Sequence, residues 1–256
     1  MFVDADNTLW DTDSVYAAAQ LALLEAVETE LGAKVCEPNR LAYVRMADQQ
    51  LAERHHSGLR YPPRLLAKAL ALTLSGMAVD TAARRARSTR REGNLIADSV
   101  AMEIERAFLT AARASPKLRT GVRTGLKCLD EAGHPLVVLT EGSRARALKV
   151  AQERRIGGYF HRIIEGTKSQ RLFQRVLQAT GQPDVAFMVG DQLERDIRPA
   201  KAAGLRTIFF PGRFRPRWEP EEAEVVPDYS ITSFMEVPHI VDRAALGIAP
   251  GRISSR

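Results

Sequence analysis

The hydrophobic pattern of the chain changes at about residue 115. Before that point apolar residues recur at helical spacing, and no strand-like run interrupts them for roughly 100 residues. Glycine and proline mark the breaks between helices at Gly58, Pro62, Pro63 and Gly76. The pattern therefore predicts an all-helical segment, whose helices are 15–33, 41–56, 63–74 and 81–114.

After residue 116 short apolar runs alternate with helical stretches. The runs typical of strands are 135–142, 162–164, 184–191, 205–212 and 229–234. The helical stretches are 123–133, which ends at the natural cap position Gly133, and then 143–155, 168–181 and 195–204. Such alternation indicates right-handed βαβ units and a mostly parallel sheet.

Residues 2–6 predict one more strand, which the helical segment separates from all the others. We therefore expect an α/β fold: a Rossmann-like, mostly parallel sheet flanked by helices, with an inserted all-helical domain. The expected domains are a core of residues 1–13 and 116–240, a helical domain of residues 14–115, and a C-terminal tail of residues 241–256.

Composition adds three constraints to this picture. A hydrophobic fraction of 45% in 256 residues provides a substantial core and argues against disorder. Cys36 and Cys128 lie too far apart in sequence to suggest a disulfide framework or a metal cluster. The sequence shows no apparent leader peptide and no run of apolar residues long enough to span a membrane. We therefore expect a cytoplasmic protein without membrane contact. The net charge of +6 favours anionic partners only weakly.

Polar residues follow the predicted strands at the ends where an open parallel sheet carries its site. In chain order they are Asp4 and Asp6, Thr140, Lys168, then Asp191 and Asp196. Because the carboxyl ends of parallel strands share one edge, we expect these side chains to lie close together.

This order of motifs resembles that of the haloacid dehalogenase superfamily of phosphohydrolases. The stretches "FVDADNTLW" and "VGDQLERDIRPAKAAGLRTIFF" are similar to the first and fourth motifs of that family. The helical segment stands where relatives with an α-helical cap of the first type (C1) carry that cap. The resemblance implies a phosphoric monoester hydrolase.

The resemblance also implies roles for the motif residues. Asp4 would be the nucleophile that forms an aspartyl-phosphate, and Asp6 the general acid and base. Thr140 and Lys168 would hold the phosphoryl oxygens and offset their charge. An acid at Asp6 favours a phosphatase over a dehalogenase.

The charges at this edge point to a cation. If Asp6 holds a proton, three carboxylates face the single ammonium of Lys168, and a phosphate dianion would be repelled. All the predicted ligands are oxygens, so Mg²⁺ is the expected cofactor. By resemblance, Asp4, the Asp6 backbone carbonyl and Asp191 would hold it, and Asp196 would act through water or orient Lys168.

Two neighbours of Thr140 complete the expected substrate-binding set of Thr140, Glu141, Gly142 and Lys168. Glu141 stands where many relatives have Asn, so we expect it either to face away or to contact a positive group of the substrate.

We expect Trp10 to pack in the turn after the first strand, and His55 and His56 to be exposed or at an interface without binding a metal.

The leading hypothesis is a Mg²⁺-dependent phosphatase acting on a small phosphorylated metabolite. A phosphomutase is an alternative within the same fold. The arginine-rich run from Arg84 to Arg91 leaves open a phosphatase of nucleotides or nucleic-acid ends, although nucleic-acid binding is weakly supported because no aromatic residues interleave the run. A further alternative is a non-catalytic phosphate-binding or signalling protein of this fold.

Overall fold

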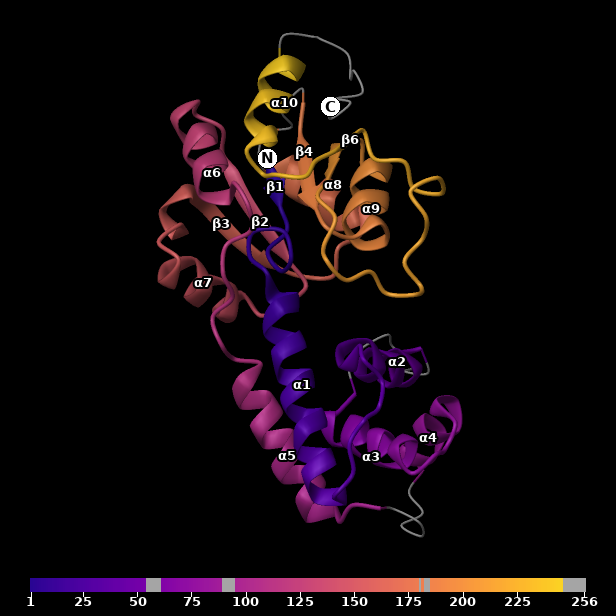
Figure 1. Cartoon of the computed structure of the whole chain (residues 1–256). Helices are drawn as coiled ribbons and strands as arrows, with labels where there is room; N and C mark the ends of the chain where they lie inside the picture. The colour runs from indigo at the N-terminus through magenta and orange to yellow at the C-terminus, as the bar shows by residue number, and fades with distance from the viewer. Residues whose placement is uncertain (54–60, 89–94, 180, 182–184, 246–256) are drawn as a thin grey trace. The chain divides into compact units, whose positions relative to one another are not determined.

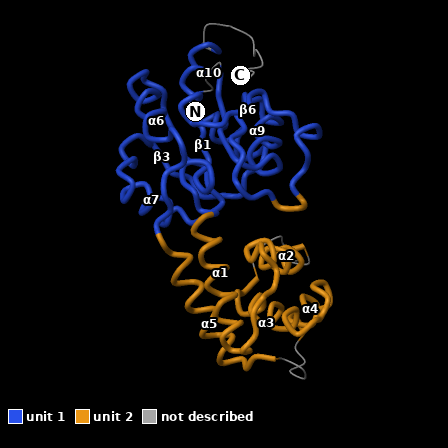
Figure 2. Tube along the Cα trace, in the orientation of Figure 1, with its two compact units in different colours: residues 1–13, 115–215, 219–256 blue, residues 14–114, 216–218 orange. Residues whose placement is uncertain are grey.

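The computed structural model describes residues 1–53, 61–88, 95–179, 181 and 185–245. The chain divides into two compact units, coloured separately in Figure 2. The α/β unit contains residues 1–13, 115–215 and 219–256, and the helical unit contains residues 14–114 and 216–218. Each unit has its own buried apolar core.

Six strands of the described residues form one sheet in the order β3-β2-β1-β4-β5-β6, and every neighbouring pair is parallel. The strands are β1 (Phe2–Val3), β2 (Leu136–Thr140), β3 (Phe160–Glu165), β4 (Phe187–Gly190), β5 (Arg206–Phe209) and β6 (Tyr229–Ser230). This confirms the expected Rossmann-like α/β fold. β1 lies in the middle of the sheet, although most of the sheet follows it by more than a hundred residues.

Alternating side chains of the strands bury both faces of the sheet. Val3, Val138 and Val189 belong to the core on one face, which is covered by α6, α7 and α10. Phe2 and Met188 belong to the core on the other face, which is covered by α8 and α9. The bounds are α6 (Val122–Glu131), α7 (Arg144–Glu153), α8 (Gln170–Ala179), α9 (Arg198–Ala202) and α10 (Glu236–Ala245), with a 3₁₀ turn η1 (Gly157–Tyr159) and a π-helical turn η2 (Leu193–Ile197) (Figure 1).

The structure corrects two expectations for the α/β unit. β1 ends at Val3 instead of residue 6, because the chain turns at once and Leu9 N donates to Ala5 O at 2.9 Å. Residues 241–245, expected in the tail, belong to α10, where Val241 and Ala244 pack into the core. The rest of the expected tail lies outside the described residues.

The helical unit is formed by α1 (Thr12–Leu31), α2 (Arg40–Ala52), α3 (Pro63–Leu74), α4 (Val79–Ala86) and α5 (Asp98–Ala111). The single helix expected over 81–114 is therefore wrong, since α4 ends at Ala86 and α5 begins at Asp98. Both helices pack against α3, and the described residues 87–88 and 95–97 between them are not helical. Among the described residues, no helix has the length and apolar character needed to cross a membrane.

A buried carboxylate joins the end of α1 to the start of α2. Glu28 accepts hydrogen bonds from both terminal nitrogens of Arg40, at 2.8 and 2.9 Å. Lys34 Nζ and the Val35 backbone N–H complete its shell at 3.2 and 2.9 Å. The bonds from Arg40, more than those from Val35 and Lys34, lower the pKa of Glu28 to about 2, against burial, which acts in the opposite direction.

Replacement of this carboxylate should weaken the helical unit. Glu28→Gln removes the charge that pairs with Arg40 and should lower the free energy of unfolding by on the order of 2 kcal/mol, measured by urea denaturation at pH 7. Lys34→Gln is the matched control and should cost well under about 1 kcal/mol, because Lys34 is exposed.

The same pair has a defined pH dependence. Because folding lowers the pKa of Glu28 from 4.5 to about 2, its stabilisation is present above pH 4.5 and is lost as the pH falls toward 2. The stability difference between wild type and Glu28→Gln should therefore shrink over that interval. A difference that stays constant from pH 6 to pH 3 would contradict this assignment.

Candidate active site

The turn after β1 is fixed by backbone hydrogen bonds. Asp4 N donates to Val189 O of β4 at 2.9 Å, which extends the pairing of β1 by one residue. Asn7 then adopts a positive φ of 58°, a conformation that Asn tolerates better than most residues, and its side chain accepts from Asp13 N at 2.8 Å. Asp4 and Asp6 therefore stand at the carboxyl end of the central strand.

Lys168 joins Asp4 to Asp196. Its Nζ donates to Oδ1 of Asp4 and to Oδ1 of Asp196, and its side chain is 4% exposed. The other oxygen of each carboxylate is also bonded: Thr8 Oγ1 donates to Asp4 Oδ2 at 3.1 Å, and Gln192 N donates to Asp196 Oδ2 at 3.0 Å. Thr8 is a member of this cluster that sequence reasoning missed.

Asp191 completes a group of three buried carboxylates. One oxygen from each of Asp4, Asp191 and Asp196 lies within 4.8 Å of the others. Burial raises the pKa of Asp4 to about 7 even though Lys168 opposes the change, and burial together with the charges of Asp4 and Asp196 raises the pKa of Asp191 well above its usual value. Burial alone would lower the pKa of Lys168, but Asp196 and Asp4 outweigh it and raise that pKa.

This group fits a divalent cation. In the part of the chain that the structure describes, no hydrogen bond or ion pair reaches the Asp191 carboxylate, although the residue is only 9% exposed. The single positive charge of Lys168 cannot balance the negative charges of three clustered carboxylates. Oxygen ligands of this kind suit Mg²⁺, so Asp4 and Asp191 could hold such an ion.

Gly190 permits the close approach of Asp196. A Cβ atom at position 190 would lie 2.3 Å from both Cβ and Cγ of Asp196. Any side chain there would displace the carboxylate that holds Lys168.

Asp6 is oriented by two donors on one oxygen. Its Oδ1 accepts from Trp10 Nε1 at 3.1 Å and from Thr12 Oγ1 at 2.5 Å. Trp10 is buried in the core, so it packs in the turn and also orients Asp6. The role of Thr12 has no signal in the sequence, because it depends on the turn that brings α1 back to Asp6.

Thr140 and Gly142 lie beside Asp6 at the end of β2. The Thr140 hydroxyl accepts from Gly142 N at 3.0 Å. A Cβ atom at Gly142 would lie 3.0 Å from Asp6 Oδ2 and 3.2 Å from Thr140 Oγ1. The three residues therefore surround a common space next to Asp6 Oδ2.

Both oxygens of Glu141 contact protein groups. Oε1 accepts from Lys168 N at 2.9 Å, and Oε2 pairs with Arg195 at 3.1 Å. Glu141 therefore supports the backbone of Lys168 from the loop after β2. This contact was not anticipated in either of the two orientations that the sequence left open.

Arg119 joins the loop after β1 to the loop after β5. It donates to the backbone carbonyls of Asn7, Phe210 and Pro211, and its guanidinium lies 3.4 Å from the centre of the Phe210 ring. Burial lowers its pKa, while the charge of Asp191 opposes that change. Sequence reasoning missed Arg119, because an arginine between a helical segment and a predicted helix has no distinguishing pattern.

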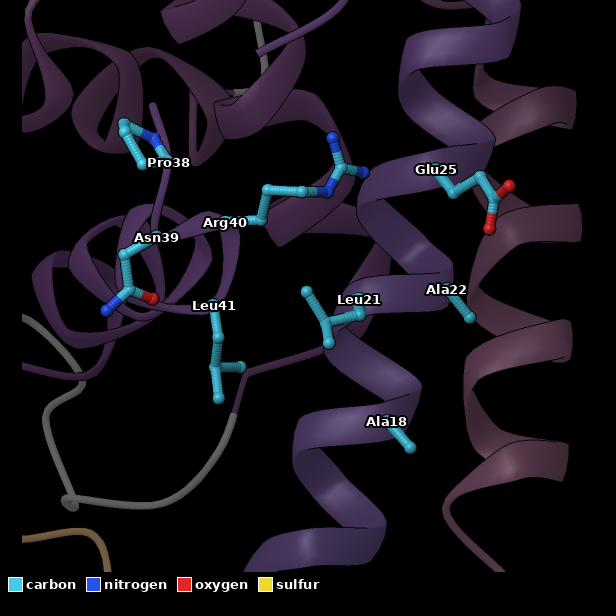
Figure 3. Close-up of a pocket in the computed structure, with 8 residues that line it drawn as sticks. All are labelled: Ala18, Leu21, Ala22, Glu25, Pro38, Asn39, Arg40 and Leu41. Carbon is cyan, nitrogen blue, oxygen red and sulfur yellow. The ribbon is translucent and has the colours of Figure 1, made fainter. Parts of the chain in front are cut away.

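The helical unit contains a hollow of its own, between α1 and the start of α2, with a volume of about 780 Å³. Figure 3 shows its lining, in which Ala18, Leu21 and Leu41 are apolar. Arg40 at its rim already pairs with Glu28, so this cation is not free for an anionic ligand.

Two other sequence features fall partly or wholly outside the described residues. His55 and His56 lie outside them, as does the end of the run from Arg84 to Arg91. Within the described part of that run, Arg84 forms an ion pair with Asp80 at 2.8 Å.

Two curated proteins are similar in sequence to part of this chain. A glyceraldehyde 3-phosphate phosphatase of Pyrococcus furiosus is 27% identical over 130 residues, which are 48% of this chain and 54% of that protein. A phosphoserine phosphatase of Thermus thermophilus is 37% identical over 73 residues, which are 28% of each protein. The matches thus span about half and about a quarter of these relatives.

The fold and the family are matched over a larger part of the chain. A haloacid dehalogenase-like hydrolase from Xanthomonas campestris has a TM-score of 0.63 at 20% identity, and the match covers 96% of both chains, which shows a shared fold. The sequence model of the haloacid dehalogenase-like hydrolases matches residues 1–204. With most of its length matched by this model, the chain belongs to the haloacid dehalogenase-like hydrolase family.

Proposed function

We propose that this protein is a Mg²⁺-dependent phosphatase that hydrolyses a small phosphorylated metabolite through an aspartyl-phosphate. One observation carries the proposal: the buried Asp4 carboxylate is held by Lys168 and Thr8, while Asp6, two residues on, is held by different donors. Two carboxylates with separate partners suit two separate roles. The phosphatase names of the two curated relatives support the same substrate class.

In the first step Asp4 attacks phosphorus, so that an Asp4–phosphorus bond forms and the ester P–O bond breaks. Lys168 fixes the nucleophile and, with the Thr140 hydroxyl, offsets negative charge on the phosphoryl oxygens. The leaving oxygen takes a proton from Asp6. Since the donors Trp10 and Thr12 both bind Oδ1, Oδ2 is the oxygen that carries this proton.

In the second step a water molecule attacks the phosphorus of the aspartyl-phosphate. Asp6, now ionised, takes a proton from that water, and the Asp4–phosphorus bond breaks to release phosphate. A phosphomutase would share the first step and pass the phosphoryl group to a second hydroxyl. Measured release of inorganic phosphate separates the two reactions.

Mg²⁺ would be held by Asp4, the Asp6 backbone carbonyl and Asp191, with Asp196 orienting Lys168. When bound, the ion supplies positive charge that offsets the carboxylates and the incoming phosphate. This explains how a site with three buried acids could accept an anionic substrate.

Removal of the nucleophile should abolish turnover. Asp4→Asn should lower kcat for p-nitrophenyl phosphate by roughly 10⁴-fold or more, because an amide cannot form the acyl-phosphate. Asp130→Asn, a change of an exposed carboxylate on α6, is the matched control and should retain wild-type kcat. Substantial turnover by correctly folded Asp4→Asn would refute the assigned nucleophile.

Removal of metal should inactivate the enzyme, and Mg²⁺ should restore it. Binding of Mg²⁺ can also be measured without turnover, through its effect on thermal unfolding. Mg²⁺ at about 100 times its Kd should add about 2.7 kcal/mol to the free energy of unfolding and raise Tm by several degrees. Asp191→Asn should reduce that rise, whereas Asp130→Asn should leave it unchanged. Equal Mg²⁺ shifts in wild type and Asp191→Asn would exclude Asp191 as a ligand.

A methyl group at position 190 tests the contact between β4 and Asp196. Gly190→Ala should displace the Asp196 carboxylate, free Lys168 from one partner, and cost about 1–3 kcal/mol of stability with a large loss of kcat. Gly158→Ala is the control, since a Cβ there meets no atom within 4 Å. Unchanged kcat in Gly190→Ala would show that the placement of Asp196 does not matter for turnover.

A further inference from the structure

The α/β unit contains a polar cavity of about 350 Å³ that the proposed mechanism does not use. Its walls come from the loop after β1, the segment that precedes α6, and the loop after β5. Three cationic side chains line it, namely those of Lys117, Arg119 and Arg213. Asp11 is the single carboxylate residue among the lining residues, so the lining carries a net positive charge.

The cations of this cavity are only partly compensated. Within the described ranges, the side chains of Lys117 and Arg213 form no ion pair or hydrogen bond. Arg213 lies close enough to Arg119 for its charge to lower the pKa of Arg119 further. Like charges that line one cavity attract an anion, which would relieve their mutual repulsion.

Arg119 gives the cavity a fixed cation. Three of its N–H groups bond to the carbonyls of Asn7, Phe210 and Pro211, and its guanidinium stacks on Phe210. A guanidinium has five N–H groups, so two remain for a ligand. Because the side chain is already ordered, little conformational entropy is lost when an oxyanion binds to it.

The cavity adjoins the carboxylate cluster. Gly212 lines it, and a Cβ atom at Gly212 would lie 3.2 Å from Asp191 Oδ2 and 3.7 Å from Asn7 Cβ. Asn7 directly follows Asp6 in the chain. An anion in this cavity would therefore lie next to the place where the phosphoryl group reacts.

We infer that this cavity binds a second acidic group of the substrate. The inference rests on the proposed phosphatase function and narrows it: the preferred substrates are phosphate monoesters that also carry a carboxylate or a second phosphate. The phosphoryl group lies at Asp4, and the second oxyanion lies among Lys117, Arg119 and Arg213. A substrate without the second acid leaves these cations uncompensated and binds less well.

Matched esters test the inference with the full-length protein. Phosphate release is measured for 2-phosphoglycolate against ethyl phosphate, for 3-phosphoglycerate against glycerol 3-phosphate, and for p-nitrophenyl phosphate as a reference. In at least one pair, the ester with the second acid should have a kcat/KM about 10-fold higher or more. Arg213→Gln and Lys117→Gln should each reduce that preference several-fold, chiefly through KM.

Arg175→Gln is the charge-matched control. Arg175 is an exposed residue of α8, and its replacement should leave the preference at the wild-type value. No preference in either pair, or a preference that Arg213→Gln and Lys117→Gln leave intact, would overturn the inference. An equal loss in Arg175→Gln would also overturn it, since net charge alone would then explain the effect.

Calorimetric binding separates failure of this inference from failure of the phosphatase function. If no ester, p-nitrophenyl phosphate included, releases phosphate, the proposed function fails. Tighter binding of 2-phosphoglycolate than of ethyl phosphate, lost in Arg213→Gln, would still support the cavity assignment, and equal binding would refute it. Inorganic phosphate that binds through Arg213 without competing with 2-phosphoglycolate would identify a separate anion site and contradict the inference.

Discussion

The ammonium group of Lys168 joins two of three clustered buried carboxylates, and the loops at the carboxyl edge of the sheet meet at that contact. Asp4, Asp191 and Asp196 would repel one another strongly in a site from which water is largely excluded. Lys168 binds two of them, and burial raises the pKa of Asp4 and of Asp191. This crowding of acidic groups is the physical reason why the site fits a divalent cation.

The strand order brings this cluster together. β1 pairs with β2 on one side and with β4 on the other, so the residues that follow these strands meet at one edge. Asp4 and Asp191 directly follow β1 and β4, and Thr140 is the last residue of β2. The supporting contacts also lie at the loops that follow the strands. Glu141, after β2, accepts a hydrogen bond from the backbone of Lys168, and Arg119 joins the loops after β1 and β5.

The sequence predicted the fold and the strand-end cluster because both follow from local patterns. Short apolar runs alternate with helices, and polar residues stand at or just after the ends of the first, second and fourth strands. Trp10, Thr12 and Arg119 could not be predicted in their observed contacts, because those contacts depend on the path of turns that local periodicity does not determine. The break between α4 and α5 was missed although the sequence carries a signal for it, since residues 87–94 contain no apolar side chain and include Gly93.

The central position of β1 has a consequence for folding. Phe2 pairs with Val137 on one side and with Met188 on the other. During synthesis the strand that carries Asp4 therefore stays unpaired while the whole helical segment leaves the ribosome, and its second partner arrives later still. Closing such long loops is slow compared with forming local helices. Asp4 and Asp191 can thus come together only once β4 has been made, well after the helical segment.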